Sequence, residues 1–270
     1  MVTLSSFPRL ILSFLPLEWQ RDLERHRHRT FYDTLRAEVK TASEGDSALT
    51  YTLRSFDEHR CIYVHVPKAG GNSIAQALFG NAAGGHSGAN RYRMIFGRDF
   101  WRYFKFAFVR NPYTRLVSAY EYLCRGGHPA WPQDRRFRDE VLGHYADFED
   151  FVLRWLTPGR NWPVPHFQPQ TEFLTLDGNL AMDFIGRFER IGEDFVLVAE
   201  RLRIRAGLPH LNKTGGARPS LESYFFNGRV TERVQEVYAE DFRLLRYPVA
   251  VPHRDAMLSC NEPSSHISPI

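Results

Sequence analysis

A short glycine-containing loop carries side chains and backbone amides that could bind an anion. Its residues are Pro67, Lys68, Ala69, Gly70, Gly71, Asn72 and Ser73. Glycines let the backbone approach a phosphate group closely, and the amides at the start of a helix can donate hydrogen bonds to phosphate oxygens. Lys68 adds a positive charge, while Asn72 and Ser73 add side-chain donors. The loop is therefore predicted to hold an oxyanion, although an ordinary tight turn with an exposed lysine would leave the same pattern.

Arg110 and Ser118 form a second candidate anion site. Arg110 follows an apolar run at residues 104–109, and Ser118 comes two helical turns later. A guanidinium group can bind phosphate oxygens through two parallel hydrogen bonds, so this pair could clamp a second phosphate. Taken alone the segment is ambiguous, because an arginine at the end of a strand often forms only a surface ion pair.

Both polar segments are predicted to lie between a buried strand and a helix. Apolar and β-branched runs predict the strands, and the spacing of apolar residues predicts the helices. The predicted strands span residues 62–66, 104–109 and 182–188, and the predicted helices span residues 73–79, 116–123, 193–206 and 229–245. Asn111 and Pro112 are suited to begin the helix after the second strand.

Strands that alternate with helices indicate an α/β fold, with a central, mainly parallel sheet flanked by helices on both faces. Ligands of such sheets bind beyond the carboxyl ends of the strands. Both polar segments are expected at that edge. The region 125–167 is rich in Pro, Arg and Trp and is interpreted as an insertion with a short helix near residues 148–156.

The composition is that of a globular protein with a weakly basic surface. The chain has 270 residues, 43% of them hydrophobic, and a formal net charge of +4. This mild excess suits an anionic ligand and does not require nucleic acid as a partner. The three cysteines form no CxxC pair, and the histidines and carboxylates show no metal-binding spacing. A reducing, cytoplasmic location and the absence of a metal site are therefore expected.

Residues 1–50 are predicted to be a helical extension that precedes a domain at residues 51–251, and residues 252–270 a poorly ordered tail. The apolar stretch from Leu10 to Leu17 contains a proline and is too short to span a bilayer. The basic residues 21–29 could give a peripheral contact with anionic lipid, but a solvated helix face is the preferred interpretation.

Taken together, the two anion-binding segments resemble the cofactor-binding signatures of sulfotransferases. The chain looks most similar to the bacterial relatives of the Golgi carbohydrate sulfotransferases, often called sulfotransferase family 2. Four further stretches fit the resemblance in the same order, namely residues 86–89 (HSGA), 168–174 (QPQTEFL), 183–189 (DFIGRFE) and 208–214 (LPHLNKT). The resemblance covers the chain from about Cys61 to Tyr247 and implies a P-loop-type three-layer sandwich with a central parallel sheet.

The resemblance implies a role for each polar segment. Residues 68–73 would bind the 5′-phosphosulfate of 3′-phosphoadenosine 5′-phosphosulfate (PAPS), and Arg110 with Ser118 would bind its 3′-phosphate. Asn212 and Lys213 are expected to close over the nucleotide. Lys68 would stabilise the charge that grows on the leaving phosphate during sulfuryl transfer, as positioned donors do in related chemistry. The resemblance calls for no metal ion.

A histidine is the natural general base near neutral pH. His86 lies where related enzymes carry a histidine in an H-x-[ST]-A context, although here serine is second and glycine third. His166, in the sequence HFQPQ, resembles the H-x-x-P-Q element of eukaryotic carbohydrate sulfotransferases. The base is predicted to be His86, with His166 as the alternative, and His65 is interpreted as a core or supporting residue.

The acceptor is expected to be a hydroxyl group on a glycan or another small molecule. Arginines and aromatic residues in the insertion suit a sugar or an anionic acceptor. Two other classes stay open: a P-loop nucleotide kinase or hydrolase, which the missing GxxxxGK[ST] order disfavours, and a non-catalytic protein that binds a nucleotide or another anion. No feature of the sequence specifies an oligomeric state.

Overall fold

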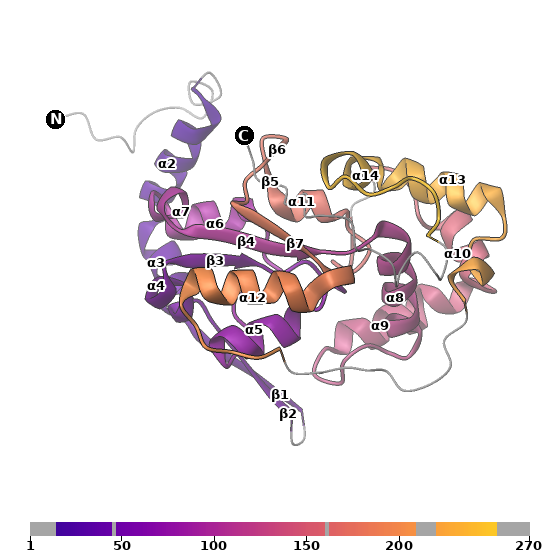
Figure 1. Ribbon diagram of the computed structural model, residues 1–270, viewed down its shortest axis with the longest axis horizontal. Helices are drawn as coiled ribbons and strands as arrows, with labels where there is room; N and C mark the ends of the chain where they lie inside the picture. The colour runs from indigo at the N-terminus through magenta and orange to yellow at the C-terminus, as the bar shows by residue number, and fades with distance from the viewer. Residues whose placement is uncertain (1–14, 45–46, 160–161, 209–219, 253–270) are drawn as a thin grey trace.

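The centre of the molecule is a small parallel sheet. The computed structural model describes residues 15–44, 47–159, 162–208 and 220–252. Among these residues, the parallel strands are β3 (Cys61–Val64), β4 (Phe104–Val109) and β7 (Phe184–Arg187), in the order β3-β4-β7 (Figure 1). Val64 pairs with Ala107, and Val109 pairs with Arg187. The chain therefore leaves all three strands at the same edge of the sheet.

The three strands are the ones that the sequence predicts, and their burial explains their composition. All four residues of β3 and five of the six residues of β4 are buried. A parallel sheet covered on both faces needs apolar side chains on both sides of each strand, which gives continuous rather than alternating apolar runs. Within the sheet, the rings of Tyr63 and Phe106 stack with their centroids 4.9 Å apart.

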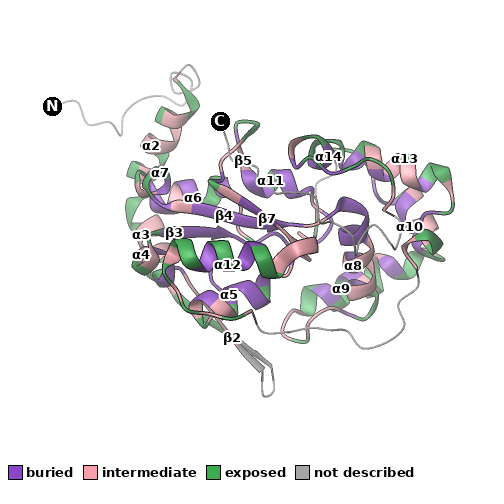
Figure 2. Ribbon diagram, in the orientation of Figure 1, coloured by how far each residue is buried: buried purple, intermediate pink, exposed green. Residues whose placement is uncertain are grey.

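Helices flank the sheet, as the sequence predicts. Those after β3 are α5 (Gly71–Phe79), α6 (Ala89–Phe96) and α7 (Asp99–Arg102), and those after β4 are α8 (Pro112–Cys124), α9 (Pro132–Glu140), α10 (Phe148–Arg154) and α11 (Gln170–Leu174). After β7 come α12 (Ile191–Leu202), α13 (Gly228–Val237) and α14 (Ala239–Leu244), and short 3₁₀ turns occur at η2 (Leu142–His144), η3 (Phe188–Arg190) and η4 (Leu221–Ser223). In Figure 1, α5 and α12 lie along one side of the sheet, and α6 and α11 along the other. Figure 2 shows the central strands buried between these helices.

Two of the predicted helices differ from the structure at their ends. The helix expected at residues 193–206 ends at Leu202, because Arg203 adopts a left-handed conformation with φ of 57°. The stretch at residues 229–245 forms two helices, which meet at Tyr238. Tyr238 is buried and its hydroxyl donates to the carbonyl oxygen of Phe167. The predicted start of α8 is confirmed, with Pro112 in the first turn and the Asn111 side chain accepting from the amide of Tyr113 at 3.0 Å.

Two antiparallel hairpins were not predicted. Helices α2 (Leu17–Arg27) and α3 (Arg29–Ala37) begin the described chain, and β1 (Val39–Glu44) then pairs with β2 (Ser47–Thr52). The helical part of the N-terminal region thus ends before residue 39. A second, very short hairpin consists of β5 (Thr175–Leu176) and β6 (Asn179–Leu180). Strand β2 is also tied to the loop after α5, since Ala82 donates to the Thr50 carbonyl at 2.7 Å and Thr52 donates to the Ala83 carbonyl at 3.0 Å.

Ion pairs hold the N-terminal helices against the rest of the molecule. The buried Arg93 of α6 donates to Glu18 at 2.8 Å and to Asp22 at 2.7 Å, both on α2. Arg21 forms a two-pronged pair with Asp177, at 2.8 and 2.7 Å. Part of the basic segment 21–29 therefore makes contacts within the protein. No helix in the described ranges has the length and the apolar character that a membrane span requires.

Candidate active site

The two predicted anion-binding segments meet at the edge where β3 and β4 end. Arg110 Nη1 donates to the backbone carbonyl of Lys68 at 3.3 Å, and Nε donates to the hydroxyl of Thr114 at 3.0 Å. The guanidinium also lies over the ring of Phe188, 4.4 Å from its centroid. Arg110 thus joins the loop after β3 to the helix after β4.

The backbone of the first loop is shaped to turn directly into α5. Lys68 has a φ of 68° and Gly70 a φ of 83°, and both values fall in the left-handed region. A non-glycine residue there costs roughly 1–3 kcal/mol and persists only when its surroundings hold it. The first helical hydrogen bond of α5 runs from the amide of Ile74 to the carbonyl of Gly70 at 3.2 Å. The amides of Gly71, Asn72 and Ser73 precede it and belong to the group that a helix cannot satisfy internally.

The glycine at position 71 is required by close packing. A Cβ atom there would lie 1.8 Å from Nε2 and Cδ2 of His65, so no side chain fits. Ala69 and Ser73 are buried, whereas Asn72 is exposed in the first turn of the helix. The loop therefore rests on the imidazole of His65, and its outward groups are the first amides of α5 and the side chains of Lys68 and Asn72.

The ammonium group of Lys68 lies over an aromatic ring. Its Nζ atom is 3.8 Å from the ring centroid of Tyr122, a residue of α8. The Tyr122 hydroxyl donates to the carboxylate of Asp134 at 2.9 Å, and Asp134 is buried at the start of α9. Burial raises the pKa of Asp134, while Tyr122, His128 and the charge of Lys68 lower it. The insertion thus supplies a side chain that orients Tyr122 and, through it, Lys68.

Arg115 is a further site residue, and the sequence did not single it out. It lies on α8 with a side chain 1% exposed, and its Nε donates to the carbonyl of Pro67 at 3.0 Å. Its Nη2 donates to the carbonyls of His166 and Gln168 at 3.2 and 2.8 Å. One buried guanidinium therefore fixes both the glycine loop and the segment that carries His166.

Gln170 binds the backbone of Arg110, and Asp241 in turn binds the backbone of Gln170. The amide group of Gln170 forms two hydrogen bonds with the backbone of Arg110, one to its N–H at 2.9 Å and one to its carbonyl at 2.7 Å. The buried carboxylate of Asp241, on α14, accepts from the amides of Gln170 and Thr171 at 2.9 and 2.8 Å. These contacts pin the end of β4 to α11 and α14.

Three histidines cluster beside Lys68. The ring centroids of His65 and His86 are 4.4 Å apart, and those of His86 and His166 are 5.7 Å apart. His86 Nδ1 lies 3.4 Å from the backbone carbonyl of His65. A carbonyl oxygen can only accept, so this contact requires the hydrogen on Nδ1 and leaves the lone pair on Nε2.

The cluster favours neutral imidazoles. Burial lowers the pKa of His65 and His166, and the charge of neighbouring groups, Lys68 among them, lowers both further. His86 is exposed to solvent, unlike the other two. Surrounding protein atoms nevertheless lower the pKa of His86, and this is the largest effect. The hydrogen bond with the His65 carbonyl raises the pKa by less, and the charges of Lys68 and Arg115 lower it further. Solvent contact limits the size of this shift, and its direction leaves His86 neutral at pH 7.

The structure brings most of the predicted site residues together. Lys68, Arg110, His86 and His166 lie in one contact network through Arg115 and the glycine loop. Ser118 is half-buried on α8, and its role stays a prediction. Asn212 and Lys213 lie outside the described residues. Within the described ranges, no group of three or more His, Cys, Asp or Glu side chains could hold a metal ion.

Comparison with known proteins identifies the family. The model of the sulfotransferase family matches residues 51–248. The chain belongs to the sulfotransferase family. It is also similar to mouse carbohydrate sulfotransferase 11, with 27% identity over 167 residues, which cover 54% of this chain and 47% of the relative. The matched region thus spans about half the length of that relative, and no solved structure matches the chain significantly. The family that the two polar segments indicated is therefore confirmed.

The close approach of Gly71 and His65 leads to a prediction about the loop after β3. In Gly71→Ala the new methyl group would overlap the imidazole of His65, so either the loop or the ring must move. Affinity for adenosine 3′,5′-bisphosphate, measured by titration calorimetry, is expected to fall at least tenfold, because each misplaced amide forfeits a charge-assisted hydrogen bond of about 1.5–3 kcal/mol.

Two variants control this experiment. Gly192→Ala, in the first turn of α12, adds a methyl group with nothing within 4 Å and should leave the affinity unchanged. The double variant His65→Ala/Gly71→Ala removes the overlap and should regain most of the lost affinity. Unchanged binding in Gly71→Ala, or no recovery in a double variant whose circular dichroism is native, would contradict this role of the packing.

Proposed function

We propose that this protein transfers a sulfuryl group from PAPS to a hydroxyl group of a carbohydrate. The observation that carries the proposal is the contact between Arg110 and the Lys68 loop at the tips of two neighbouring parallel strands, in a member of the sulfotransferase family. A donor with one anionic group at each end needs two such sites side by side. The similarity to a carbohydrate sulfotransferase favours a sugar acceptor.

The donor substrate fits the chemistry of the residues at this edge. The amides that open α5 and the ammonium of Lys68 would bind the 5′-phosphosulfate, because both present positive charge to an oxyanion. Arg110 and Ser118 would bind the 3′-phosphate, with Asn212 and Lys213 closing over the nucleotide. The parallel sheet and the turn from β3 into α5 are consistent with the P-loop-type three-layer sandwich that the family resemblance implies.

The proposed step is an in-line substitution at sulfur. The acceptor oxygen forms a new bond to sulfur while the bond from sulfur to the 5′-phosphate oxygen breaks, and adenosine 3′,5′-bisphosphate leaves. The acceptor proton passes to Nε2 of His86. Negative charge grows on the leaving phosphate, where Lys68 and the loop amides would stabilise it, and one positioned donor of this kind is typically worth about 3–4 kcal/mol.

His86 is favoured over His166 as the base because an acceptor must be able to reach it. His86 is exposed, whereas the side chain of His166 is buried and its backbone carbonyl is held by Arg115. The lone pair on Nε2 of His86 is available for a proton, since Nδ1 faces the carbonyl of His65. His166 would then act through its packing against His86 and Tyr122.

Other assignments are tested by the same assays. Turnover of ATP that requires magnesium would favour a nucleotide kinase or hydrolase. Binding of adenosine 3′,5′-bisphosphate with no transfer to any acceptor would favour a non-catalytic nucleotide-binding protein.

A cytoplasmic location and the absence of peripheral membrane contact also stay predictions.

Substitutions at the two anion sites are expected to affect different quantities, kcat at one site and nucleotide affinity at the other. Lys68→Ala should lower kcat for transfer of labelled sulfate from PAPS by roughly 10²–10³-fold and change nucleotide affinity little, because Lys68 meets charge that develops in the transition state. Arg110→Ala should chiefly weaken binding of adenosine 3′,5′-bisphosphate, by roughly 10–100-fold. Arg125→Ala, an exposed arginine just after α8, is the matched control. Equal effects of Lys68→Ala and Arg110→Ala on both quantities would argue against this division.

The dependence of kcat/KM on pH is expected to reflect the protonation of His86. Only neutral imidazole accepts a proton, and the pKa of His86 is lowered from 6.5, so kcat/KM should fall only below pH 6.5 and stay level from pH 6.5 to 8. His86→Ala should lower kcat by roughly 10²–10⁴-fold and remove the acidic limb. An alanine variant within about tenfold of the parent would exclude His86, and loss of the limb in His166→Ala alone would transfer the role to His166.

A further inference from the structure

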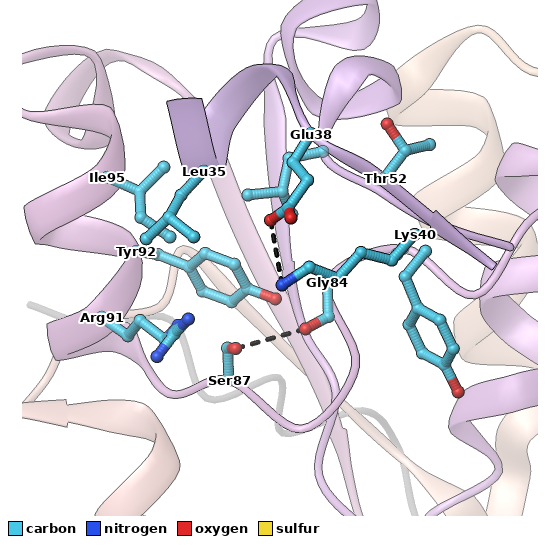
Figure 3. A pocket seen from close by; sticks show the side chains of 12 residues that line it. Leu35, Glu38, Lys40, Thr52, Gly84, Ser87, Arg91, Tyr92 and Ile95 are labelled. Carbon is cyan, nitrogen blue, oxygen red and sulfur yellow. Dashed lines mark hydrogen bonds and ion pairs between the residues drawn. The ribbon is translucent and has the colours of Figure 1, made fainter. Parts of the chain in front are cut away.

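Separate segments hold the two ends of the candidate active site. At one end, the loop that carries His86 is held by the Ser87 hydroxyl, which donates to the carbonyl of Gly84 at 3.2 Å. Figure 3 shows this hydrogen bond in the pocket between that loop, the β1–β2 hairpin and α6. At the other end, the side chain of Arg110 lies against the short turn η3, which directly follows β7. The proposed reaction assigns no role to this turn.

The η3 turn reaches from the third strand of the sheet to the glycine loop. In the strand order β3-β4-β7, β4 separates β7 from β3. A Cβ atom on Gly70, in the loop after β3, would nevertheless lie 3.3 Å from the ring of Phe188 and 2.6 Å from the side chain of Ile191. The same phenylalanine ring lies beneath Arg110. The turn after β7 therefore packs against both anion-binding segments.

The ring of Phe188 supports the guanidinium group of Arg110 without using its hydrogen-bond donors. The guanidinium carbon is 4.4 Å from the ring centroid. Guanidinium groups stack on aromatic faces, and their five N–H donors lie in the plane of the group. An aromatic ring therefore restrains the group and takes up none of its donors, whereas a carboxylate partner would compete with a phosphate for them.

The carboxylate of Glu189 fixes the main chain next to Arg110. Its Oε1 atom accepts from the amide of Asn111 at 2.7 Å, and its Oε2 atom accepts from the hydroxyl of Tyr247 at 3.0 Å. Burial and the charge of Glu189 raise the pKa of Tyr247, so this hydroxyl stays protonated and donates. Glu189 thus fixes the point at which the chain turns from β4 into α8, and with it the direction in which the Arg110 side chain leaves the backbone.

The η3 turn is itself held in place. The buried carboxylate of Asp194, in the first turn of α12, accepts from the amide of Arg187 at 2.6 Å and from Nε of Arg190 at 3.2 Å. These two arginines stand immediately before Phe188 and immediately after Glu189 in the sequence. A residue that positions another must have its own conformation fixed, and this turn meets that condition.

We propose that Phe188 and Glu189 are positioning residues that direct the guanidinium group of Arg110 toward the 3′-phosphate of the nucleotide. The inference rests on the proposed function. Phe188 supports the charged group and Glu189 fixes the backbone beside it, so both act through Arg110 and neither takes part in sulfuryl transfer. Their loss lowers affinity for a nucleotide that carries a 3′-phosphate and leaves affinity for one without it unchanged.

Glu189 is tested with two substitutions and two nucleotides. In Glu189→Ala the Asn111 amide loses its acceptor, so the dissociation constant for adenosine 3′,5′-bisphosphate, measured by titration calorimetry, should rise roughly tenfold. The constant for adenosine 5′-monophosphate should stay within about twofold, because this nucleotide presents no phosphate to Arg110. Glu189→Gln should match the parent, because its amide oxygen can accept from Asn111 while its NH2 group donates to the Tyr247 oxygen. Glu193→Ala, which changes an exposed glutamate in the first turn of α12, is the matched control and should alter neither constant.

Phe188 is tested by a double-mutant cycle with Arg110. Phe188→Leu keeps an apolar side chain against Gly70 and removes the ring beneath the guanidinium, so the dissociation constant for adenosine 3′,5′-bisphosphate should rise roughly fivefold. In an Arg110→Ala background the same substitution should have no further effect, because no guanidinium group is left to position. Phe184→Leu, at the other end of β7, changes another half-buried phenylalanine and should leave the affinity unchanged.

The outcomes distinguish failure of this proposal from failure of the proposed function. A parent that binds both nucleotides equally would overturn the proposed function and the positioning role with it. A parent that prefers the bisphosphate, and keeps that preference in either Glu189→Ala or Phe188→Leu, would overturn the positioning role alone. Equal losses for both nucleotides, no rescue by Glu189→Gln, or an equal effect of Phe188→Leu with and without Arg110 would also overturn it. Circular dichroism checks that each variant is folded, and if Glu189→Ala does not fold, the cycle of Phe188 and Arg110 decides.

Discussion

The hydrogen bond from Arg110 to the main-chain carbonyl of Lys68 is the contact on which the proposed chemistry depends. It exists because β3 and β4 are parallel neighbours in register, so their two polar loops leave the sheet at the same edge. Lys68 adopts a left-handed conformation that most side chains avoid, and two arginines bind carbonyls on either side of that turn. The loop therefore has its shape before any ligand arrives, which reduces the ordering that binding requires.

The insertion contributes to this pre-organisation as well as to any specificity. Asp134 holds Tyr122, and Tyr122 lies beneath the ammonium group of Lys68. Arg115 reaches from the middle of α8 to the carbonyls of Pro67 and His166, so the lysine and two of the three histidines share one scaffold. Surrounding protein atoms, and to a smaller extent the charge of Lys68, lower the pKa of all three histidines, which favours their neutral forms. A histidine that stays neutral at pH 7 and a lysine with a fixed position suit the proposed sulfuryl transfer.

The strands, the two polar segments and their meeting at one sheet edge could be predicted from the sequence, because each depends on a local pattern and on the geometry of parallel sheets. The roles of Arg115, Gln170 and Asp134 could not, since their partners lie 51, 60 and 12 residues away along the chain and no local pattern pairs them. The hairpin from Val39 to Thr52 was missed because its strands are largely polar, without the apolar run or alternation that marks a buried strand. The family position of His86 predicts it as the base, and of the three histidines it alone is exposed, which the sequence does not indicate.

The most direct test of the account is the selectivity of the unmodified protein between two nucleotides that differ only at the 3′ position. Titration calorimetry should give a dissociation constant for adenosine 3′,5′-bisphosphate at least tenfold lower than that for adenosine 5′-monophosphate, because only the former presents an anionic group to each loop. Equal affinities for the two nucleotides would mean that the loops after β3 and β4 do not bind opposite ends of one ligand, and would contradict the proposed reaction.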